Sequence, residues 1–200
     1  MTLAGANGDK RTVTPSIIDT SGPASTIDIV FDPAGTLQWQ DQNIPCAIGA
    51  NGVSGNKIEG DSATPAGCMP LRRVLYRPDR IAPPKTPLPV APLTPRDGWC
   101  DDPSDPLYNQ HIRQPFAGNS EILWRTDAVY DVIVVLGYND NPVMAGKGSA
   151  IFMHVARADF SPTRGCIAVS RDALIEILRT CNPRSRLCVP PSDSPPDMLM

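Results

Sequence analysis

The chain has 200 residues, of which 41% are hydrophobic and 20% are charged, and these values are typical of a globular domain. Its net charge of −3 and its acidic pI exclude the clustered basic surface of a nucleic-acid-binding protein, so no nucleic-acid partner is expected. The sequence contains no apolar run long enough for a transmembrane helix, and its N-terminus lacks the apolar core of a signal peptide.

The 23 prolines concentrate in two segments, residues 80–97 and 189–197. Because proline lacks a backbone donor and is excluded from the middle of a sheet, these segments are predicted to be long loops. Nearer the N-terminus, apolar residues alternate over 26–32 and 36–40 on either side of the turn sequence DPAG, which predicts a β-hairpin. A third short apolar run at 44–49 predicts another strand.

Further strands are predicted where short apolar or β-branched runs occur, at 70–76, 130–138, 148–156 and 185–189. The segment 120–130 is predicted to be a short helix or a turn. Only 170–181 has the apolar spacing of a good helix, with Ser170 as its N-cap and Pro183 as its stop. The pattern therefore predicts one mainly β domain over residues 25–190, with flexible tails at 1–24 and 191–200.

The six cysteines contain no Cys-x-x-Cys pair, so a structural zinc site is not expected. An even number permits disulfides, and the most plausible pair is Cys181 with Cys188, because the two flank a short turn that contains proline. Six free and mostly buried thiols fit the sequence equally well. The cysteines are Cys46, Cys68, Cys100, Cys166, Cys181 and Cys188.

The stretch MHVARADFSPTRGCIAVS, residues 153–170, holds the best candidates for chemistry. A cysteine nucleophile attacks as the thiolate, so Cys166 would need a base, which His154 at the end of a predicted strand supplies. Gly165 lets the backbone turn sharply, and the N–H groups of Gly165 and Cys166 are candidates for an oxyanion hole. Arg164 and the N-terminus of the following helix would add a positive field around the sulfur.

Taken alone, this pair fits two interpretations equally well. One is a thiol nucleophile with its base, and the other is a buried Cys166 beside a hydrogen-bonded core histidine, His154. A metal site formed by these two residues with Cys100 or Asp101 has less support, so neither a metal nor a cofactor is expected.

Two motifs in the right order resemble the L,D-transpeptidase catalytic domain family (YkuD-type). In that family a strand ends in His, a loop later comes Ser/Thr-x-Gly-Cys, and a Thr-Pro-x-Gly loop lies upstream. The segments GWCDDP and LYNQ within 98–110, and LGYND at 136–140, resemble a smaller branch of the family. The residues that match the two motifs are Thr64, Pro65, Gly67, His154, Thr163, Gly165 and Cys166.

The resemblance covers roughly residues 26–190 and implies a β-sandwich-like fold with one main helix after the cysteine. It implies that Cys166 attacks a peptide bond of a peptidoglycan stem and that His154 takes the thiol proton, without a cofactor or metal. Peptidoglycan stems are then the donor and the acceptor, carbapenem-type β-lactams are possible ligands, and the expected location is the periplasm or cell envelope.

Three positions depart from the family pattern, which leaves substrate choice open. Arg164 stands where a His is usual, Ala168 where Arg or Asn is frequent, and Val155 where Gly or Ser is usual. The bond that is cut could therefore follow the third or the first stem residue. A hydrolase that uses the same residues, and a non-catalytic wall-binding module, are the alternatives.

Several polar and aromatic residues are predicted to contact substrate, each with a structural alternative. Arg164 is expected to bind a carboxylate and to tune the thiol, and Asp101 to bind an amine unless it belongs only to a turn cluster. The aromatic residues are expected either in a cleft or in the core, and Asn139 either in a turn or on substrate. The predicted substrate-binding residues are Trp99, Asp101, Tyr138, Asn139, Thr163 and Arg164.

Overall fold

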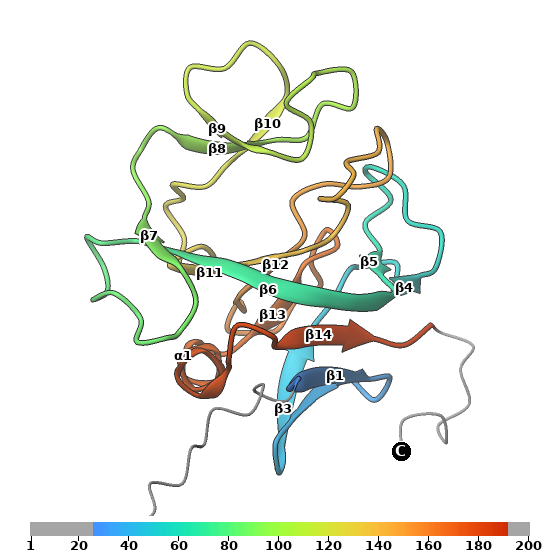
Figure 1. Cartoon of the computed structure of the whole chain (residues 1–200), viewed down its shortest axis with the longest axis vertical. Coiled ribbons are helices and arrows are strands. Elements are labelled where there is room, and N and C mark those ends of the chain that lie inside the picture. The colour runs from blue at the N-terminus through green and yellow to red at the C-terminus, as the bar shows by residue number, and fades with distance from the viewer. Residues whose placement is uncertain (1–25, 192–200) are drawn as a thin grey trace, which may run out of the picture.

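The computed structural model describes residues 26–191, so the predicted tails fall outside the described residues apart from residue 191. It confirms a mainly β domain, in which strands are joined by long loops and a single α-helix, α1 (Arg171–Thr180), follows Cys166 (Figure 1). No helix among residues 26–191 is long and apolar enough to cross a membrane.

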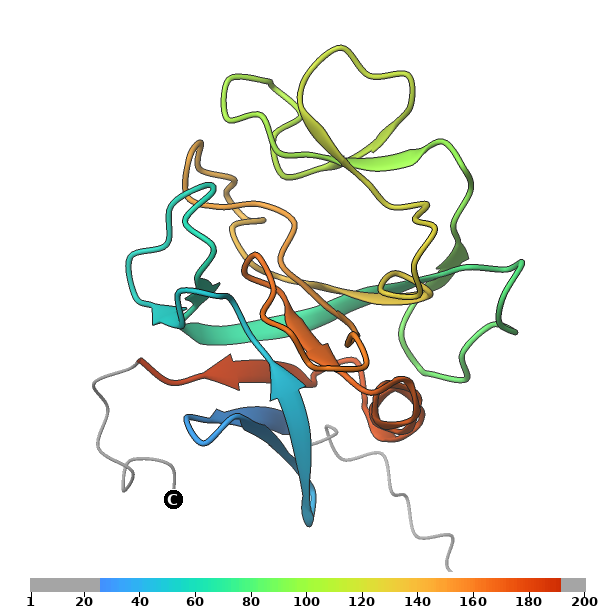
Figure 2. The ribbon, with the colours of Figure 1, turned by 180° about the vertical axis from the view of Figure 1, so that it is seen from behind.

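Most of the strands form one large sheet that closes on itself (Figure 1 and Figure 2). Their order is β11-β12-β13-β3-β2-β1-β14-β6-β7, and β11 at one end also pairs with β6 near the other end. The bounds are β1 (Asp28–Asp32), β2 (Thr36–Trp39), β3 (Gln42–Ala47), β6 (Gly67–Tyr76), β7 (Val90–Pro92), β11 (Val132–Leu136), β12 (Phe152–Val155), β13 (Ile167–Val169) and β14 (Arg186–Val189).

The long strand β6 makes this closure possible. Its first half, residues 67–70, pairs antiparallel with β14, and its second half, residues 71–76, pairs antiparallel with β11. The register shifts between Val135 and Leu136 of β11, and such an irregularity increases the local twist of a sheet. One strand therefore belongs to both halves of the sheet and holds them together.

Strand β11 is buried on both faces, as its continuous β-branched sequence predicts. Because successive side chains of a strand point to opposite faces, Val132 and Val134 lie in the main core, whereas Ile133 and Val135 lie in a second core with Phe152. The second core also contains Cys166.

A small three-stranded sheet covers this second core and lies above the large sheet at the top of Figure 1. We call residues 97–122 the cap; it contains β8 (Asp97–Cys100), β9 (His111–Arg113) and β10 (Ser120–Ile122). The Trp99 ring packs edge-on against Phe152, with 5.0 Å between the ring centroids. The prediction of a short helix or turn at 120–130 is wrong at its start, where β10 pairs with β8.

Helix α1 begins where the sequence predicts. The Ser170 side chain accepts a hydrogen bond from the backbone N–H of Ala173 at 3.2 Å, which confirms it as the N-cap. Leu174, Ile177 and Leu178 are fully buried in the main core, as their spacing on one face of the helix requires.

The disulfide differs from both expectations. Cys68 is bonded to Cys188, and Cys181 is a buried free thiol, so the predicted Cys181–Cys188 pair is wrong, as is the alternative of six free thiols. Cys68 and Cys188 lie directly opposite each other where β6 pairs with β14. Nothing in the local sequence indicates this strand pairing, which is why the correct partner could not be predicted.

Candidate active site

The two motifs that lie a hundred residues apart in the sequence are in direct contact in the structure. Strand β5 (Thr64–Pro65), which pairs with β4 (Val53–Ser54), carries the upstream motif. The hydroxyl of Thr64 donates a hydrogen bond to the carbonyl oxygen of Gly165 at 3.0 Å and accepts one from the N–H of Gly49 at 2.9 Å. The upstream loop therefore holds the turn that presents Cys166.

The turn itself requires a glycine and is fixed by a hydroxyl. Gly165 has a φ of +132°, and a Cβ at this position would lie 2.9 Å from the carbonyl oxygen of Ala63. The Thr163 hydroxyl accepts from the Gly165 N–H at 3.1 Å and donates to the Cys166 carbonyl at 2.6 Å. Thr163 thus holds the turn, and its Gly165 bond occupies one of the two N–H groups predicted for the oxyanion hole.

Cys166 is a buried, protonated thiol in the resting protein. Its Sγ donates to the carbonyl oxygen of Ala150 at 3.1 Å and accepts from the N–H of Phe152 at 3.4 Å. Burial, together with the negative charge of Glu121, raises the pKa of Cys166 to about 12, and the Lys57 ammonium opposes this shift. The N-terminus of α1, which is expected to favour a thiolate, follows Cys166 in the chain only after strand β13.

His154 is buried, and one of its ring nitrogens is hydrogen-bonded to the backbone. It lies on β12, between β11 and β13, and its Nδ1 is 3.0 Å from the carbonyl oxygen of Val155. Because that oxygen can only accept, Nδ1 carries the proton and Nε2 is left with its lone pair. Burial lowers the pKa of His154 to about 4. The Tyr130 ring packs edge-on against the imidazole, with 5.3 Å between the ring centroids.

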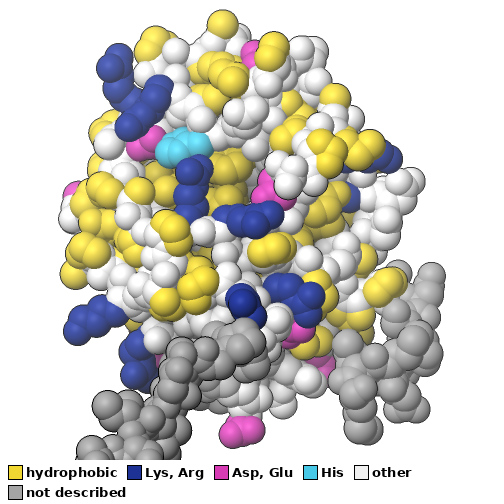
Figure 3. All heavy atoms as spheres, in the orientation of Figure 1, with side chains coloured by type: hydrophobic (Ala, Val, Ile, Leu, Met, Phe, Trp, Pro, Cys, Tyr) yellow, Lys and Arg dark blue, Asp and Glu magenta, His cyan; other side chains and the backbone are white. Residues whose placement is uncertain are grey.

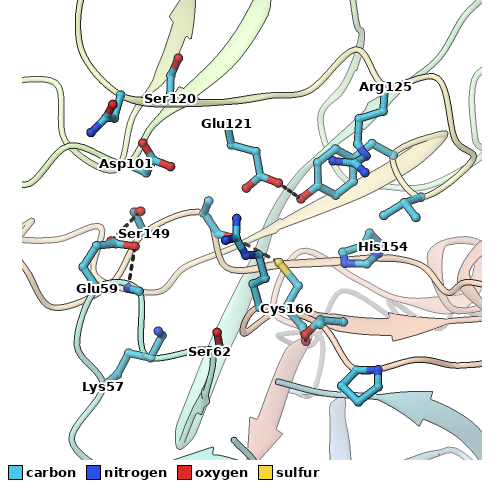
Figure 4. Close-up of a pocket in the computed structure, with 18 of the residues that line it drawn as sticks. Lys57, Glu59, Ser62, Asp101, Ser120, Glu121, Arg125, Ser149, His154 and Cys166 are labelled. Atoms are coloured by element: carbon cyan, nitrogen blue, oxygen red, sulfur yellow. Dashed lines mark hydrogen bonds between the residues drawn. The ribbon is translucent and has the colours of Figure 1, made fainter. Parts of the chain in front are cut away.

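Cys166 and His154 line the same cavity, which has a volume of about 500 Å³ (Figure 4). A thiol whose pKa is raised and an imidazole whose pKa is lowered are both neutral at pH 7. The arrangement therefore favours transfer of the proton to His154 during attack on a substrate, rather than a preformed ion pair. A shared cavity also favours the nucleophile over the interpretation of two unrelated core residues.

Carboxylates and cations alternate around this cavity. Glu121 accepts a hydrogen bond from the Tyr130 hydroxyl at 2.5 Å, and burial raises the pKa of Glu121 (Figure 4). Asp101 lies in the same cavity, and its Oδ1 is the one buried side-chain oxygen or nitrogen among residues 26–191 that has no hydrogen-bond partner. Burial and the neighbouring charge of Glu59 raise the pKa of Asp101. The cations of the cavity are Lys57, Arg125, Arg157 and Arg164.

The structure brings Asp101, Thr163 and Arg164 to this cavity but places the other predicted substrate-binding residues elsewhere. Trp99 and Tyr138 line a second cavity. The Asn139 side chain bonds to Met144 and to the Gly148 carbonyl, which makes it a turn residue. The Trp99 indole packs edge-on against Phe152 in the second core, and Trp99 does not line the cavity of Cys166.

Sequence reasoning did not select three residues that shape the site. Glu121 and Tyr130 lie in a segment without clear periodicity and come together only through folding of the cap. Asn109, which belongs to the LYNQ segment, accepts from the Trp99 indole at 2.9 Å and from the Ala150 N–H at 3.1 Å. It thereby holds the backbone N–H of Ala150, the residue whose carbonyl oxygen accepts the hydrogen bond of the Cys166 thiol, and Asn109 itself has an αL backbone (φ 57°).

Replacing Glu121 by glutamine is expected to make Cys166 more reactive. The glutamine oxygen can still accept from Tyr130, but the negative charge that raises the pKa of Cys166 is gone. A lower thiol pKa means a larger thiolate fraction above neutral pH, and we expect alkylation by iodoacetamide at pH 8 to become about threefold to tenfold faster. Intact-mass spectrometry over time measures this rate.

A matched control removes a carboxylate that is remote from the cavity. Glu176 lies on the exposed side of α1 and pairs with Arg179, so Glu176→Gln is expected to leave the alkylation rate of Cys166 unchanged. Equal rates for wild type and Glu121→Gln would show that Glu121 does not control the thiol.

Comparison with known proteins agrees with the geometry. The pattern of the L,D-transpeptidase catalytic domain family (YkuD) matches residues 17–189, which is most of the chain. Neither the curated proteins nor the solved structures compared with the chain gave a match. Cys166 and His154 line one cavity, and the Thr-Pro-x-Gly loop holds the turn before Cys166. Together with the match over most of the sequence, this shows that the chain belongs to the L,D-transpeptidase catalytic domain family.

Proposed function

We propose that this protein is a cysteine L,D-transpeptidase that cross-links peptidoglycan stem peptides. The observation that supports the proposal is the cavity that Cys166 and His154 both line, together with the Nδ1 contact that leaves Nε2 of His154 with its lone pair. Members of the family act on peptidoglycan, whose stem peptides contain junctions between L- and D-centres.

The reaction begins when the Cys166 sulfur attacks the carbonyl carbon at such a junction. The thiol proton passes to Nε2 of His154 and then to the departing amine, so that the C–N bond breaks and a thioester forms. The backbone N–H of Cys166 is the proposed donor to the oxyanion, because the N–H of Gly165 already donates to the Thr163 hydroxyl. The neutral side-chain amine of a second stem then attacks the thioester carbonyl and gives a proton to His154. The C–S bond breaks as the new amide bond forms, and His154 returns that proton to the Cys166 sulfur.

The charged groups of the cavity support an amine-bearing acceptor and a carboxylate-bearing donor. The unpaired oxygen of Asp101 and the carboxyl of Glu121 suit a protonated amine, while Arg164 suits a stem carboxylate. We do not expect Trp99, Tyr138 or Asn139 to contact the substrate, because none of them lines this cavity. A carbapenem-type β-lactam would be expected to acylate the same thiol.

The proposed site of action is the cell envelope, where peptidoglycan lies. The Cys68–Cys188 disulfide supports this location, because such bonds persist in oxidising compartments such as the periplasm. The family membership points the same way.

Product analysis with purified muropeptides tests the proposal. We expect cross-linked dimers together with a released D-amino acid, both identified by mass spectrometry. Shortened monomers without dimers would instead indicate a hydrolase in which water resolves the thioester. Unchanged muropeptides, with a free Cys166 thiol confirmed by labelling, would contradict both enzyme activities and favour a wall-binding module.

A further inference from the structure

A second cavity, of about 470 Å³, lies beneath the cap and shares no lining residue with the cavity of Cys166. Trp99, Asn109 and His111 of the cap line one side of it, and Arg73 and Val135 of the large sheet line the other. Figure 3 shows a hollow on this face of the molecule, with hydrophobic side chains at its base and a histidine and basic side chains along its rim. None of these residues lines the cavity of Cys166, and only Asn109 reaches that site, through its hydrogen bond to the Ala150 N–H.

A chain of hydrogen bonds orients a guanidinium in this cavity. The buried Asp97 carboxylate lies 2.7 Å from Nε2 of His111, and Nδ1 of His111 lies 3.4 Å from Nη2 of Arg73. Because Asp97 also accepts from Thr94, it is held as a carboxylate, so Nε2 of His111 donates to it and Nδ1 accepts from Arg73. Asp97 therefore fixes the imidazole, and the imidazole fixes one end of the Arg73 guanidinium.

Arg73 carries a positive charge that no carboxylate in residues 26–191 neutralises. Its neighbour Arg72 forms a two-pronged ion pair with Asp140, at 2.8 and 3.3 Å. Arg113 is paired with Asp97 at 3.0 Å and does not line the cavity. The Arg73 guanidinium contacts Nδ1 of His111 and lies over the Trp99 ring, with its Cζ 5.8 Å from the ring centroid. Neither of these groups is negatively charged.

One part of the cavity wall is apolar and suits an aliphatic group, and the one carboxylate that lines the cavity, Asp140, is paired with Arg72. Val135, Val143 and Ile151 line it, and Val143 is among the exposed large hydrophobic residues of the protein. A half-buried arginine whose remaining N–H donors have no acidic partner, beside an apolar wall, suits a carboxylate attached to a short aliphatic chain.

We propose that this cavity binds the carboxylate of a small aliphatic acid through Arg73. Two sources share this chemistry, the carboxyl end of a peptide stem and a free amino acid. The Asp97–His111 pair holds Arg73 in position, and Trp99 and Val135 receive the aliphatic part.

Nuclear magnetic resonance of the full-length protein tests the site directly. The probes are N-acetyl-D-alanine, free D-alanine, and N-acetyl-D-alanine methylamide, which lacks the charge. We expect both carboxylates to shift the Trp99 indole N–H signal, assigned with Trp99→Phe, in a saturable way, and the methylamide to leave it unchanged. Tighter binding of the acetylated probe would identify a peptide end, and tighter binding of D-alanine a free amino acid.

Two variants make the proposal falsifiable. Arg73→Gln is expected to weaken binding by about tenfold or more, because it removes a charge-assisted hydrogen bond, whereas Arg113→Gln is expected to bind within about twofold of wild type. If Arg73→Gln does not fold, His111→Phe keeps an aromatic ring against Trp99 but removes the group that orients Arg73, and it should weaken binding as well. Equal binding of the methylamide, no saturable shift, or unchanged affinity in the folded variant would overturn the proposal.

Discussion

Cys166→Ala is expected to abolish both cross-linking and acylation by a carbapenem, with a fall in turnover of about four orders of magnitude or more. Cys166 is the one thiol among the residues that line the cavity, and a thiol is intrinsically a much stronger nucleophile than the hydroxyls and carboxylates beside it. Intact-mass spectrometry after incubation with a carbapenem, and muropeptide analysis, measure the two losses.

We expect Cys166→Ala to lose activity because the nucleophile is missing and not because the protein unfolds. The Cys166 sulfur makes two hydrogen bonds, to Ala150 and from Phe152, and thiols contribute little as hydrogen-bonding groups. Cys46→Ala is the matched control, since Cys46 is another free thiol on β3 that does not line the cavity, and it should keep full activity. Retained cross-linking by Cys166→Ala would refute the proposed mechanism.

The parts of this fold that the sequence predicts are those that depend on local pattern. The alternation of apolar residues in β1 and β2, the β-branched run of β11 and the capped helix α1 each repeat at the period of their own secondary structure. His154 and Cys166, the proposed catalytic pair, could be singled out for a related reason, since they lie within one short segment around a strand and a turn, and the structure places both in one cavity.

The parts that could not be predicted depend on contacts between distant segments. The partner of Cys188 follows from the pairing of β6 with β14, and the buried carboxyl of Glu121 follows from the folding of the cap over the second core. The raised pKa of Cys166 has the same origin, because burial is a property of the packed molecule and dominates the effect of charges nearby in the sequence. The neighbouring residue types suggest a thiol with a lowered pKa, whereas burial in the packed molecule raises the pKa and keeps the thiol protonated.

Removal of the Cys68–Cys188 disulfide, by reduction or by replacing both residues with alanine, is expected to lower the free energy of unfolding by about 2–5 kcal/mol. The bond joins residues 120 positions apart in sequence, so it restricts the unfolded chain strongly. Urea unfolding of the double variant and of wild type, with and without dithiothreitol, measures the effect. Thiol titration of the unreduced protein in denaturant should find four thiols, those of Cys46, Cys100, Cys166 and Cys181.

The controls separate this bond from a general effect of reductant. Cys46→Ala should keep the wild-type response to dithiothreitol, and the double variant should show none. Six thiols in the unreduced protein, or the same unfolding midpoint with and without reductant, would contradict the prediction.

The same bond is expected to influence activity through the upstream loop. Cys68 follows Gly67 directly, at the end of the loop in which Thr64 bonds to the Gly165 carbonyl and so holds the turn before Cys166. Loosening β6 from β14 at this point would loosen that loop, so the double variant should lose turnover even at temperatures where it stays folded. Such a loss would also make the enzyme active mainly in an oxidising compartment, which is where its proposed substrate lies.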